Sequence, residues 1–275
     1  MQNANFAALR KTKFDLAVID YSADGSDTLR YTPQQIHSLQ NSPGKHKTVL
    51  AYMSIGEAED YRFYWQTAWD PHHTGKPAAG APTWLGPSNP DWPDNYKVKY
   101  WDPNWQAVVF QYVDKLVAAG YDGAYLDIID AFEYWGPGGP SSLNRASAAA
   151  DMVSFVKAIA HHARVVDQDP GFQIYVQNGE SLGVDPDYLA TINGLGVEDL
   201  WCNGNSRNNA AEVAARLADT DRFEYAGKTV LSIDYVTRKG LINDFYAKAK
   251  SRGYVPYAST RKLDRLTINP GHAPD

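Results

Sequence analysis

Apolar runs alternate with longer amphipathic segments along the chain, and many of the runs end in an acidic residue. Short runs rich in β-branched residues are typical of buried strands, and their alternation with helical patterns is typical of βαβ units. The pattern predicts strands near residues 14–19, 48–54, 97–101, 122–126, 172–176, 194–197, 229–233 and 254–257. A right-handed series of eight such units closes a barrel more naturally than it builds an open sheet. We therefore expect an α/β fold, a (β/α)8 TIM barrel, in a single domain over residues 1–275.

Residue types also predict where several helices begin and end. Thr32 followed by Pro33 predicts a capped helix start, and this helix is expected to run through Leu39. Pro103 opens a longer helix with apolar residues at three- and four-residue spacing, and Gly120 is expected to cap its end. Further helices are predicted at about 143–165, 210–217 and 241–250.

Residues 57–96 interrupt this rhythm. The segment contains six prolines and many aromatic residues, and loops of this length without regular structure are usually functional or disordered. Its aromatic content argues against disorder. We expect a long aromatic loop over the mouth of the barrel that forms one wall of a substrate cleft. A packed surface elaboration that touches no ligand is the alternative.

Composition narrows the classes of function. The net charge of −6 without a basic cluster argues against a nucleic-acid partner, and no apolar run approaches the ~20 residues of a membrane span. An acidic cleft favours neutral or cationic ligands. The lone Cys202 excludes an internal disulfide. The N-terminal residues show no signal peptide, which is also what a mature secreted protein would show.

The stretch 121–135 carries the clearest chemical signal, because an apolar strand ends there in Asp127 and is followed by Asp130 and several aromatic rings. The same arrangement recurs, with acidic residues after apolar runs at Asp20, Glu57, Asp102, Glu198 and Asp234. In a parallel barrel these acids would converge on one face. Asp130 or Asp199 could instead cap a helix. Concentrated negative charge is unfavourable unless a ligand or a function offsets it, so the set indicates a binding site.

Glycoside hydrolysis needs two carboxyl groups on either side of the bond that is cleaved. Asp127 follows the fourth expected strand and Glu198 follows the sixth, so the two are expected to face each other across the mouth. They are the preferred catalytic pair. Glu180, after the fifth strand, is the main rival as proton donor. Gln177 and Asn178 are expected to bind hydroxyl groups or to form a turn.

Other chemistries find less support in the sequence. The histidines do not have zinc-ligand spacing, and His161 and His162 are expected to be solvated. Neither a phosphate-binding glycine loop nor a Gly-x-Ser-x-Gly motif is present. We expect no cofactor and no metal. A barrel enzyme whose carboxylates hold Mg²⁺ or Ca²⁺ stays open as an alternative, as does a catalytically silent carbohydrate-binding barrel.

At these residues the chain resembles glycoside hydrolase family 114, the endo-α-1,4-polygalactosaminidase group. The matching segments are 16–22, 50–62, 100–103, 123–127, 176–180, 196–200 and 255–258. The resemblance implies a (β/α)8 barrel with Asp127 as nucleophile and Glu198 as acid/base. It also implies a partly galactosaminylated polysaccharide as substrate and a secreted or periplasmic setting.

Further acidic, amide and aromatic residues near the strand ends are expected to contact the sugar. They are Asp20, Tyr21, Glu57, Tyr61, Trp101, Asp102, Asp130, Gln177, Asn178, Glu180, Trp201, Asp234 and Tyr257. Because catalysis needs only two carboxylates, the others could pair with an ammonium group. We therefore expect cationic amino sugars to bind better than N-acetylated ones. The protein is expected to act on a poly- or oligosaccharide as a monomer.

Overall fold

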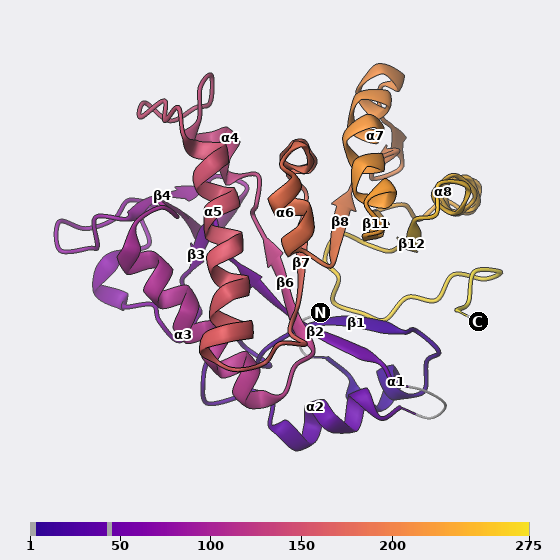
Figure 1. Ribbon diagram of the computed structural model, residues 1–275, viewed down its shortest axis with the longest axis horizontal. Coiled ribbons are helices and arrows are strands. Elements are labelled where there is room, and N and C mark those ends of the chain that lie inside the picture. Colours follow the sequence, from indigo (N-terminus) through magenta and orange to yellow (C-terminus); the bar gives the residue numbers. More distant parts are fainter. Residues whose placement is uncertain (1–3, 43–45, 275) are drawn as a thin grey trace.

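A computed structural model describes residues 4–42 and 46–274, and its centre is a curled sheet of seven parallel strands (Figure 1). The strands are β1 (Leu16–Asp20), β2 (Thr48–Ser54), β6 (Gly123–Asp127), β7 (Gln173–Gln177), β8 (Gly194–Glu198), β11 (Thr229–Asp234) and β12 (Val255–Ala258), and they neighbour one another in this order. Helices surround the outside of the sheet. The expected TIM-type barrel is therefore confirmed, with seven strands in the parallel sheet instead of eight.

The strand expected at 97–101 is wrong, because β2 pairs directly with β6 in a register that places Tyr52 opposite Tyr125. Val98 ends β5 (Trp92–Val98), which runs antiparallel to β3 (Glu57–Glu59) and β4 (Leu85–Asn89) in a separate sheet. An apolar run indicates that a strand is buried, but it does not indicate which strand lies beside it. This explains the error. Asp127 and Glu198 consequently end the third and the fifth parallel strands, with β7 between them.

The segment after β2 is a folded insertion and not the long loop without regular structure that was expected. It contains the antiparallel sheet β3-β5-β4 and the short helix η1 (Thr67–Trp69). Aromatic rings pack the insertion against α3 (Pro103–Ala119). Trp84 contacts Trp69 within the insertion at 5.3 Å and Trp105 on α3 at 4.9 Å between ring centroids. Figure 1 shows this insertion beside α3, on one side of the parallel sheet.

The remaining elements connect the strands. They are α1 (Phe6–Arg10), α2 (Pro33–Gln40), α4 (Ala131–Trp135), α5 (Ala148–His161), the π-helix η2 (His162–Val166), the 3-10 helix η3 (Glu180–Val184), α6 (Pro186–Thr191), the hairpin β9 (Cys202–Asn203) and β10 (Ser206–Arg207), α7 (Ala210–Tyr225) and α8 (Lys239–Ser251). Thr32 forms a capping box with Gln35, and Gly120 ends α3 with a left-handed φ of 77°, as their residue types predict. The helix predicted at 210–217 is longer than expected.

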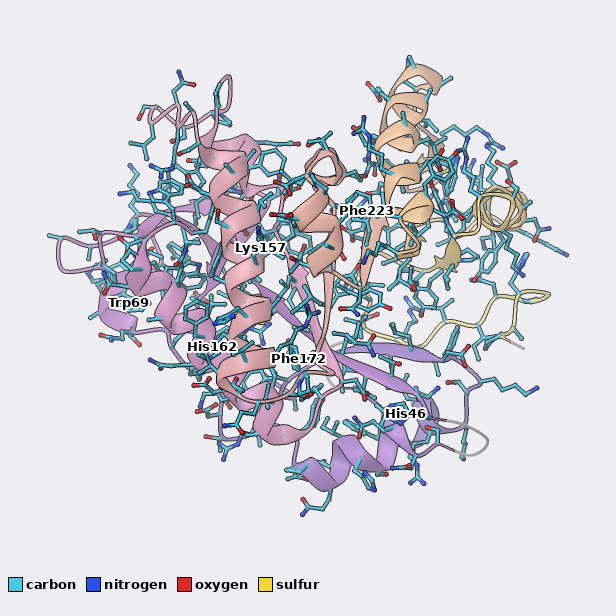
Figure 2. All side chains as sticks on the ribbon, viewed as in Figure 1. His46, Trp69, Lys157, His162, Phe172 and Phe223 are labelled. Atoms are coloured by element: carbon cyan, nitrogen blue, oxygen red, sulfur yellow. The ribbon has the colours of Figure 1, made fainter. Side chains whose placement is uncertain are left out.

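Two layers of apolar packing hold the barrel. The larger core lies between sheet and helices, and Figure 2 shows Phe172 and Phe223 among the side chains that fill this region. The smaller core lies inside the curled sheet and consists of Leu50, Tyr125 and Tyr175, with Leu16, Val18, Tyr52 and Leu231 packed against it. Within residues 4–42 and 46–274, every helix is too short or too polar to span a membrane.

Candidate active site

Asp127 lies at the carboxyl end of β6 and receives two hydrogen bonds. The Tyr52 hydroxyl on β2 donates to Oδ2 at 2.6 Å, and the backbone N–H of Ile128 donates to Oδ1 at 2.7 Å. The side chain is half-buried, so it is reachable from the mouth of the barrel. Both donors stabilise the charged form of the carboxyl group and fix its orientation.

Glu198 lies at the carboxyl end of β8 and is held in the same manner. The Asn178 side-chain amide donates to Oε2 at 3.1 Å, and the Tyr235 hydroxyl donates to Oε1. The backbone N–H of Glu198 in turn donates to Oδ1 of Asn178 at 3.1 Å. Asn178 follows β7, the strand between the two carboxyl groups. Asn178 was expected to bind hydroxyl groups or to form a turn, and its left-handed φ of 57° fits the turn; its side chain also positions Glu198.

The pKa values of both carboxyl groups are raised, and Glu198 contributes to the rise at Asp127. Burial, followed by the nearby Glu198, raises the pKa of Asp127 to about 8. Burial also raises the pKa of Glu198, although hydrogen bonds from Asn178 and Gln177 oppose the rise. Both carboxyl groups therefore keep their protons to higher pH than free side chains do. Glycoside hydrolysis requires one of two carboxyl groups to carry a proton while the other is ionised.

Three residues that immediately follow neighbouring strands have left-handed backbones. Ile128 after β6 has φ 58°, Asn178 after β7 has φ 57°, and Asp199 after β8 has φ 48°. Residues other than glycine adopt this region at a cost, and a β-branched residue such as isoleucine does so rarely. Strained backbone of this kind concentrates at functional sites. Its presence after three adjacent strands makes this edge of the sheet the candidate site.

Arg216 on α7 contacts residues at and after the ends of β7 and β8. No role for it was predicted from the sequence. Its guanidinium pairs with Glu180 at 2.5 Å and donates to the carbonyl oxygens of Glu198 at 3.0 Å and Asp199 at 3.1 Å. Glu180 is thus engaged in an ion pair at the wall of the site. This pairing makes Glu180 less suited than Glu198 to donate a proton.

A second group of acids lies next to the pair. Burial and the neighbouring Glu133 raise the pKa of Asp130 to about 6, and Glu57 and Glu180 add to the rise while Lys97 opposes it. Glu57 is completely buried, and its Oε1 accepts from Lys97 at 2.5 Å. Asp130 is half-buried and Glu133 is exposed, so these two side chains are accessible from solvent while Glu57 is not.

Asp20 belongs to a buried ion-pair network and not to the open mouth. Arg62 pairs with Asp20 and with Glu59 at 2.6 Å each, and all three side chains are buried. Tyr61 donates its hydroxyl hydrogen to Glu59 at 2.5 Å. The network joins β1 to the insertion. The contact with sugar expected for Asp20 is therefore replaced by a structural role.

Three further expected contacts also have structural roles. Asp102 caps α3 by accepting from the backbone of Asn104 at 2.9 Å. Asp234 is fully buried and accepts from two backbone N–H groups after β8, and burial raises its pKa to about 7. Tyr21 is buried and donates to the carbonyl of Gly25 at 3.0 Å. The contacts of these residues are thus with the backbone of neighbouring loops and helix starts.

The expected aromatic contacts divide into exposed and buried rings. Trp101 is half-buried between Trp135 and Arg145, whose guanidinium lies 4.3 Å from its ring centroid. Tyr257 on β12 is also half-buried. Trp201 is 6% exposed and packs against the core, so its expected stacking on sugar is wrong for this arrangement. Tyr257 packs edge-on against Phe14 at 6.0 Å between ring centroids, and its hydroxyl accepts from the backbone N–H of Thr267 at 3.1 Å, so of these two only Trp101 keeps a partly open ring without such a hydrogen bond.

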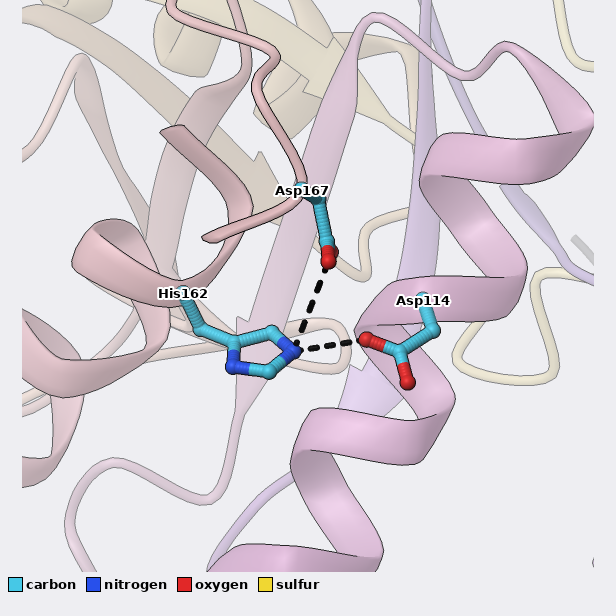
Figure 3. Close-up of side chains that lie close together, drawn as sticks. All are labelled: Asp114, His162 and Asp167. Carbon is cyan, nitrogen blue, oxygen red and sulfur yellow. Dashed lines mark hydrogen bonds and ion pairs between the residues drawn. The ribbon is translucent and has the colours of Figure 1, made fainter. Parts of the chain in front are cut away.

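The described residues contain one compact group of metal-ligand types, and it lies away from the site. His162 Nε2 is 2.6 Å from Asp114 Oδ1 and 3.7 Å from Asp167 Oδ1 (Figure 3), and the three possible ligand atoms lie within 4.8 Å of one another. The expectation that His162 is solvated is therefore wrong. These residues precede the amino ends of β6 and β7, whereas Asp127 and Glu198 end their strands. The cluster ties α3 to η2 and takes no part in the site.

Comparisons with known proteins agree with this arrangement. Residues 5–273 match the model of glycoside-hydrolase family GH114. An uncharacterized protein of Methanocaldococcus jannaschii is 38% identical over 279 residues, which are 97% of this chain and 76% of that protein. An uncharacterized protein of Thermotoga maritima is 39% identical over 285 residues, which are 100% of this chain and 84% of that protein.

Solved structures share the fold. The glycoside hydrolase domain of PelA from Pseudomonas aeruginosa superposes with a TM-score of 0.69 at 20% identity, over 98% of this chain and 95% of that one. Aspergillus fumigatus Ega3, in a complex with galactosamine, superposes with a TM-score of 0.66 at 18% identity, over 92% of this chain and 86% of that one. At such identities the likeness concerns the fold alone.

Proposed function

The chain belongs to glycoside-hydrolase family GH114 and is a glycoside hydrolase, and from this premise we propose that Asp127 and Glu198 cleave an α-linked, galactosamine-containing polysaccharide. The observation that carries the proposal is the placement of two hydrogen-bonded carboxyl groups at the carboxyl ends of β6 and β8, where Glu198 helps to raise the pKa of Asp127 to about 8. One protonated and one ionised carboxyl group supply both partners of the reaction.

In the proposed reaction Asp127 is the nucleophile and Glu198 is the acid and base. Glu198 gives its proton to the oxygen of the glycosidic bond while a carboxylate oxygen of Asp127 bonds to the anomeric carbon. Glu198 then takes a proton from the water that releases the sugar. Glu198 must carry its proton and Asp127 must be ionised when the substrate reacts. Tyr52 and Ile128 stabilise negative charge on Asp127. In the free protein burial and Glu198 outweigh these donors and raise the pKa of Asp127 to about 8, so the proposed reaction requires Asp127 to lose its proton when the substrate binds.

We propose that the substrate carries free amino groups. Asp130, Glu133 and Glu180 lie close enough to one another to shift the ionisation of Asp130 and Glu133. An ammonium group next to such carboxylates gains charge-assisted hydrogen bonds, each worth on the order of 1.5 to 3 kcal/mol. The complex of Ega3 with galactosamine is consistent with this choice. The same acids could bind neutral hydroxyl groups, which is the competing possibility.

The test is cleavage of defined polymers. Purified protein is incubated with oligomers of α-1,4-linked galactosamine and of N-acetylgalactosamine, and the products are identified by mass spectrometry. We expect cleavage of the free amine, with affinity that weakens as salt rises because screening reduces charge pairing. Equal affinity for both polymers at every salt concentration would contradict a cationic substrate. Unchanged activity with a chelator would separate this reaction from one that depends on a carboxylate-held metal.

We further propose that the enzyme works as a single-domain monomer outside the cell. A polysaccharide substrate is too large to enter a cell intact, which supports the location. The family match from residue 5 to residue 273 supports one domain. Sedimentation at several protein concentrations tests the monomer, and fractionation of a source culture tests the location.

A further inference from the structure

Tyr125 carries a buried hydroxyl group without a partner directly below the carboxyl pair. It stands two residues before Asp127 on β6, so both side chains point to the same face of the sheet. The residue is 3% exposed, and its hydroxyl oxygen has no hydrogen-bond partner among the described residues. A buried phenol normally finds an acceptor, because an unmade hydrogen bond in an apolar interior is costly. The Tyr125 hydroxyl is therefore a donor that is free to bond to a nearby acceptor.

Gly196 on β8 makes room for this hydroxyl. A Cβ atom at Gly196 would lie 1.7 Å from the Tyr125 hydroxyl oxygen, which no side chain could tolerate without displacing the ring. Gly196 stands two residues before Glu198, on the same face of β8. The missing side chain therefore lets Tyr125 reach across the interior to the strand that carries Glu198. Gly194 makes room in the same way for Tyr175.

The surroundings of Tyr125 offer two possible acceptors. The apolar neighbours inside the sheet are Leu16, Val18, Leu50 and Leu231. The titratable neighbours are Asp127 on its own strand, Glu198 on β8, Tyr52 on β2 and Tyr175 on β7. Burial, then Glu198 and then Asp127 raise the pKa of Tyr125 well above its usual value, so the phenol keeps its proton and is a donor. Both carboxyl groups already accept from a tyrosine, Asp127 from Tyr52 and Glu198 from Tyr235. The Tyr125 hydroxyl faces Gly196 on the strand of Glu198, and Glu198 affects its pKa more than Asp127 does, so Glu198 is the favoured acceptor.

We propose that Tyr125 is a positioning residue for Glu198, and that its O–H donates to the Glu198 carboxylate that forms when Glu198 has released its proton. The contact is direct or passes through one enclosed water. This inference rests on the proposed function. In the step concerned, the bond between the anomeric carbon and the leaving oxygen breaks, the Glu198 proton moves to that oxygen, and Asp127 bonds to the carbon. No bond to Tyr125 forms or breaks. A donor to the ionised carboxylate makes Glu198 a stronger acid.

The test compares Tyr125→Phe with Tyr175→Phe as a matched control. Tyr175 pairs with Tyr125 in the strand register and packs in the same cluster, so both variants remove one hydroxyl from the same layer. In Tyr125→Phe the basic limb of the kcat/KM profile should move to higher pH by on the order of one unit, because Glu198 loses a donor to its charged form. The kcat should fall about tenfold at an unchanged KM. Tyr175→Phe should leave the profile in place.

A measurement without substrate separates this inference from the proposed function. The Glu198 carboxyl is titrated by ¹³C NMR in the free protein, with Glu198→Gln used to assign its signal. Tyr125→Phe should raise the pKa of Glu198 and Tyr175→Phe should not. If the wild-type protein cleaves none of the polymers, the proposed function fails while this titration still tests Tyr125. An unshifted titration together with an unshifted pH profile would overturn the inference, as would equal changes in both tyrosine variants.

Discussion

The hydroxyl of Tyr52 on β2 lies 2.6 Å from Oδ2 of Asp127 on β6, so a neighbouring strand holds the proposed nucleophile. Asp127 also accepts from the backbone N–H of Ile128, a residue whose left-handed φ of 58° aims this N–H at the carboxyl group. The orientation of Asp127 is thus fixed by one side chain and one strained peptide. Both contacts favour its charged form.

Tyr52→Phe tests this relationship. Loss of the donor should raise the pKa of Asp127, so the acidic limb of the pH profile should move to higher pH. Activity should fall about 10- to 100-fold, the equivalent of one charged hydrogen bond. Steady-state kinetics across the pH range check this, with Tyr188→Phe as the control because Tyr188 packs on Phe223 outside the sheet. A profile identical to that of the wild type would show that the contact is dispensable.

Substrates with different leaving groups can separate the roles of the two carboxyl groups. Glu198→Gln should lower the turnover of polysaccharide about 100- to 10,000-fold. It should regain activity on an aryl glycoside, whose leaving group needs no proton. Asp127→Asn should lose activity on both substrates, because it removes the nucleophile. Circular dichroism should show an intact fold in each variant.

Glu180→Gln serves as the comparison in the same assays. Since Glu180 pairs with Arg216, its loss should act mainly on KM. If Glu180→Gln loses turnover and Glu198→Gln keeps it, the assignment of the acid is reversed.

The buried network of Arg62 should contribute more to stability than any surface pair. Arg62→Met leaves the carboxylates of Asp20 and Glu59 buried without a partner, which should lower the free energy of unfolding by about 3 to 5 kcal/mol. Arg222→Met removes an exposed pair with Asp219 and should cost about 1 kcal/mol or less. Urea denaturation followed by circular dichroism measures both. Equal losses would mean that water reaches the network.

Stability should fall as pH rises from about 4 to about 8. The pKa values of Asp127, Asp130 and Asp234 are raised to about 8, 6 and 7, mainly by burial. A carboxyl group with a raised folded pKa stabilises the protein below its unfolded pKa of about 3.9, and this contribution is lost as pH rises through the folded value. Thermal unfolding across this range should show the decline.

Asp127→Asn provides the matched variant for this pH dependence. Asparagine does not ionise, so the variant should be on the order of 2 kcal/mol more stable than the wild type at pH 8 and equal to it near pH 4. Parallel melting curves for the two proteins at all pH values would contradict the raised pKa of Asp127.

The sequence predicted most of the barrel, because its strands are short apolar runs with acids at their ends. Asp127 and Glu198 stand at such ends, and both are half-buried as the pattern suggests. The error at 97–101 has a physical cause. Val98 and Tyr100 are as buried as barrel residues, and burial is all that an apolar run reports.

The supports of the site could not be predicted in the same way. Tyr52 and Tyr235 stand in or near strands, where tyrosine is common for packing reasons alone. Arg216 lies on a polar helix and contacts carbonyl groups that no sequence pattern marks. The left-handed backbone at Ile128 could not be predicted, because the position holds neither glycine nor asparagine, the residues that favour this conformation. The acids at 102 and 234 have structural roles because their backbone neighbours need acceptors, which becomes visible only in three dimensions.

The aromatic insertion determines which part of the molecule fluorescence can observe. Seven of the eight tryptophans stand between residues 65 and 135. Trp65, Trp69, Trp84 and Trp105 form a chain of ring contacts with centroid distances of 5.1, 5.3 and 4.9 Å. Indoles this close exchange excitation energy, so their emission reports the insertion and α3 as one unit. Trp201 is the one indole in the half of the barrel built by α7 and α8. Fluorescence can follow that half alone only in a variant whose other seven tryptophans have been replaced.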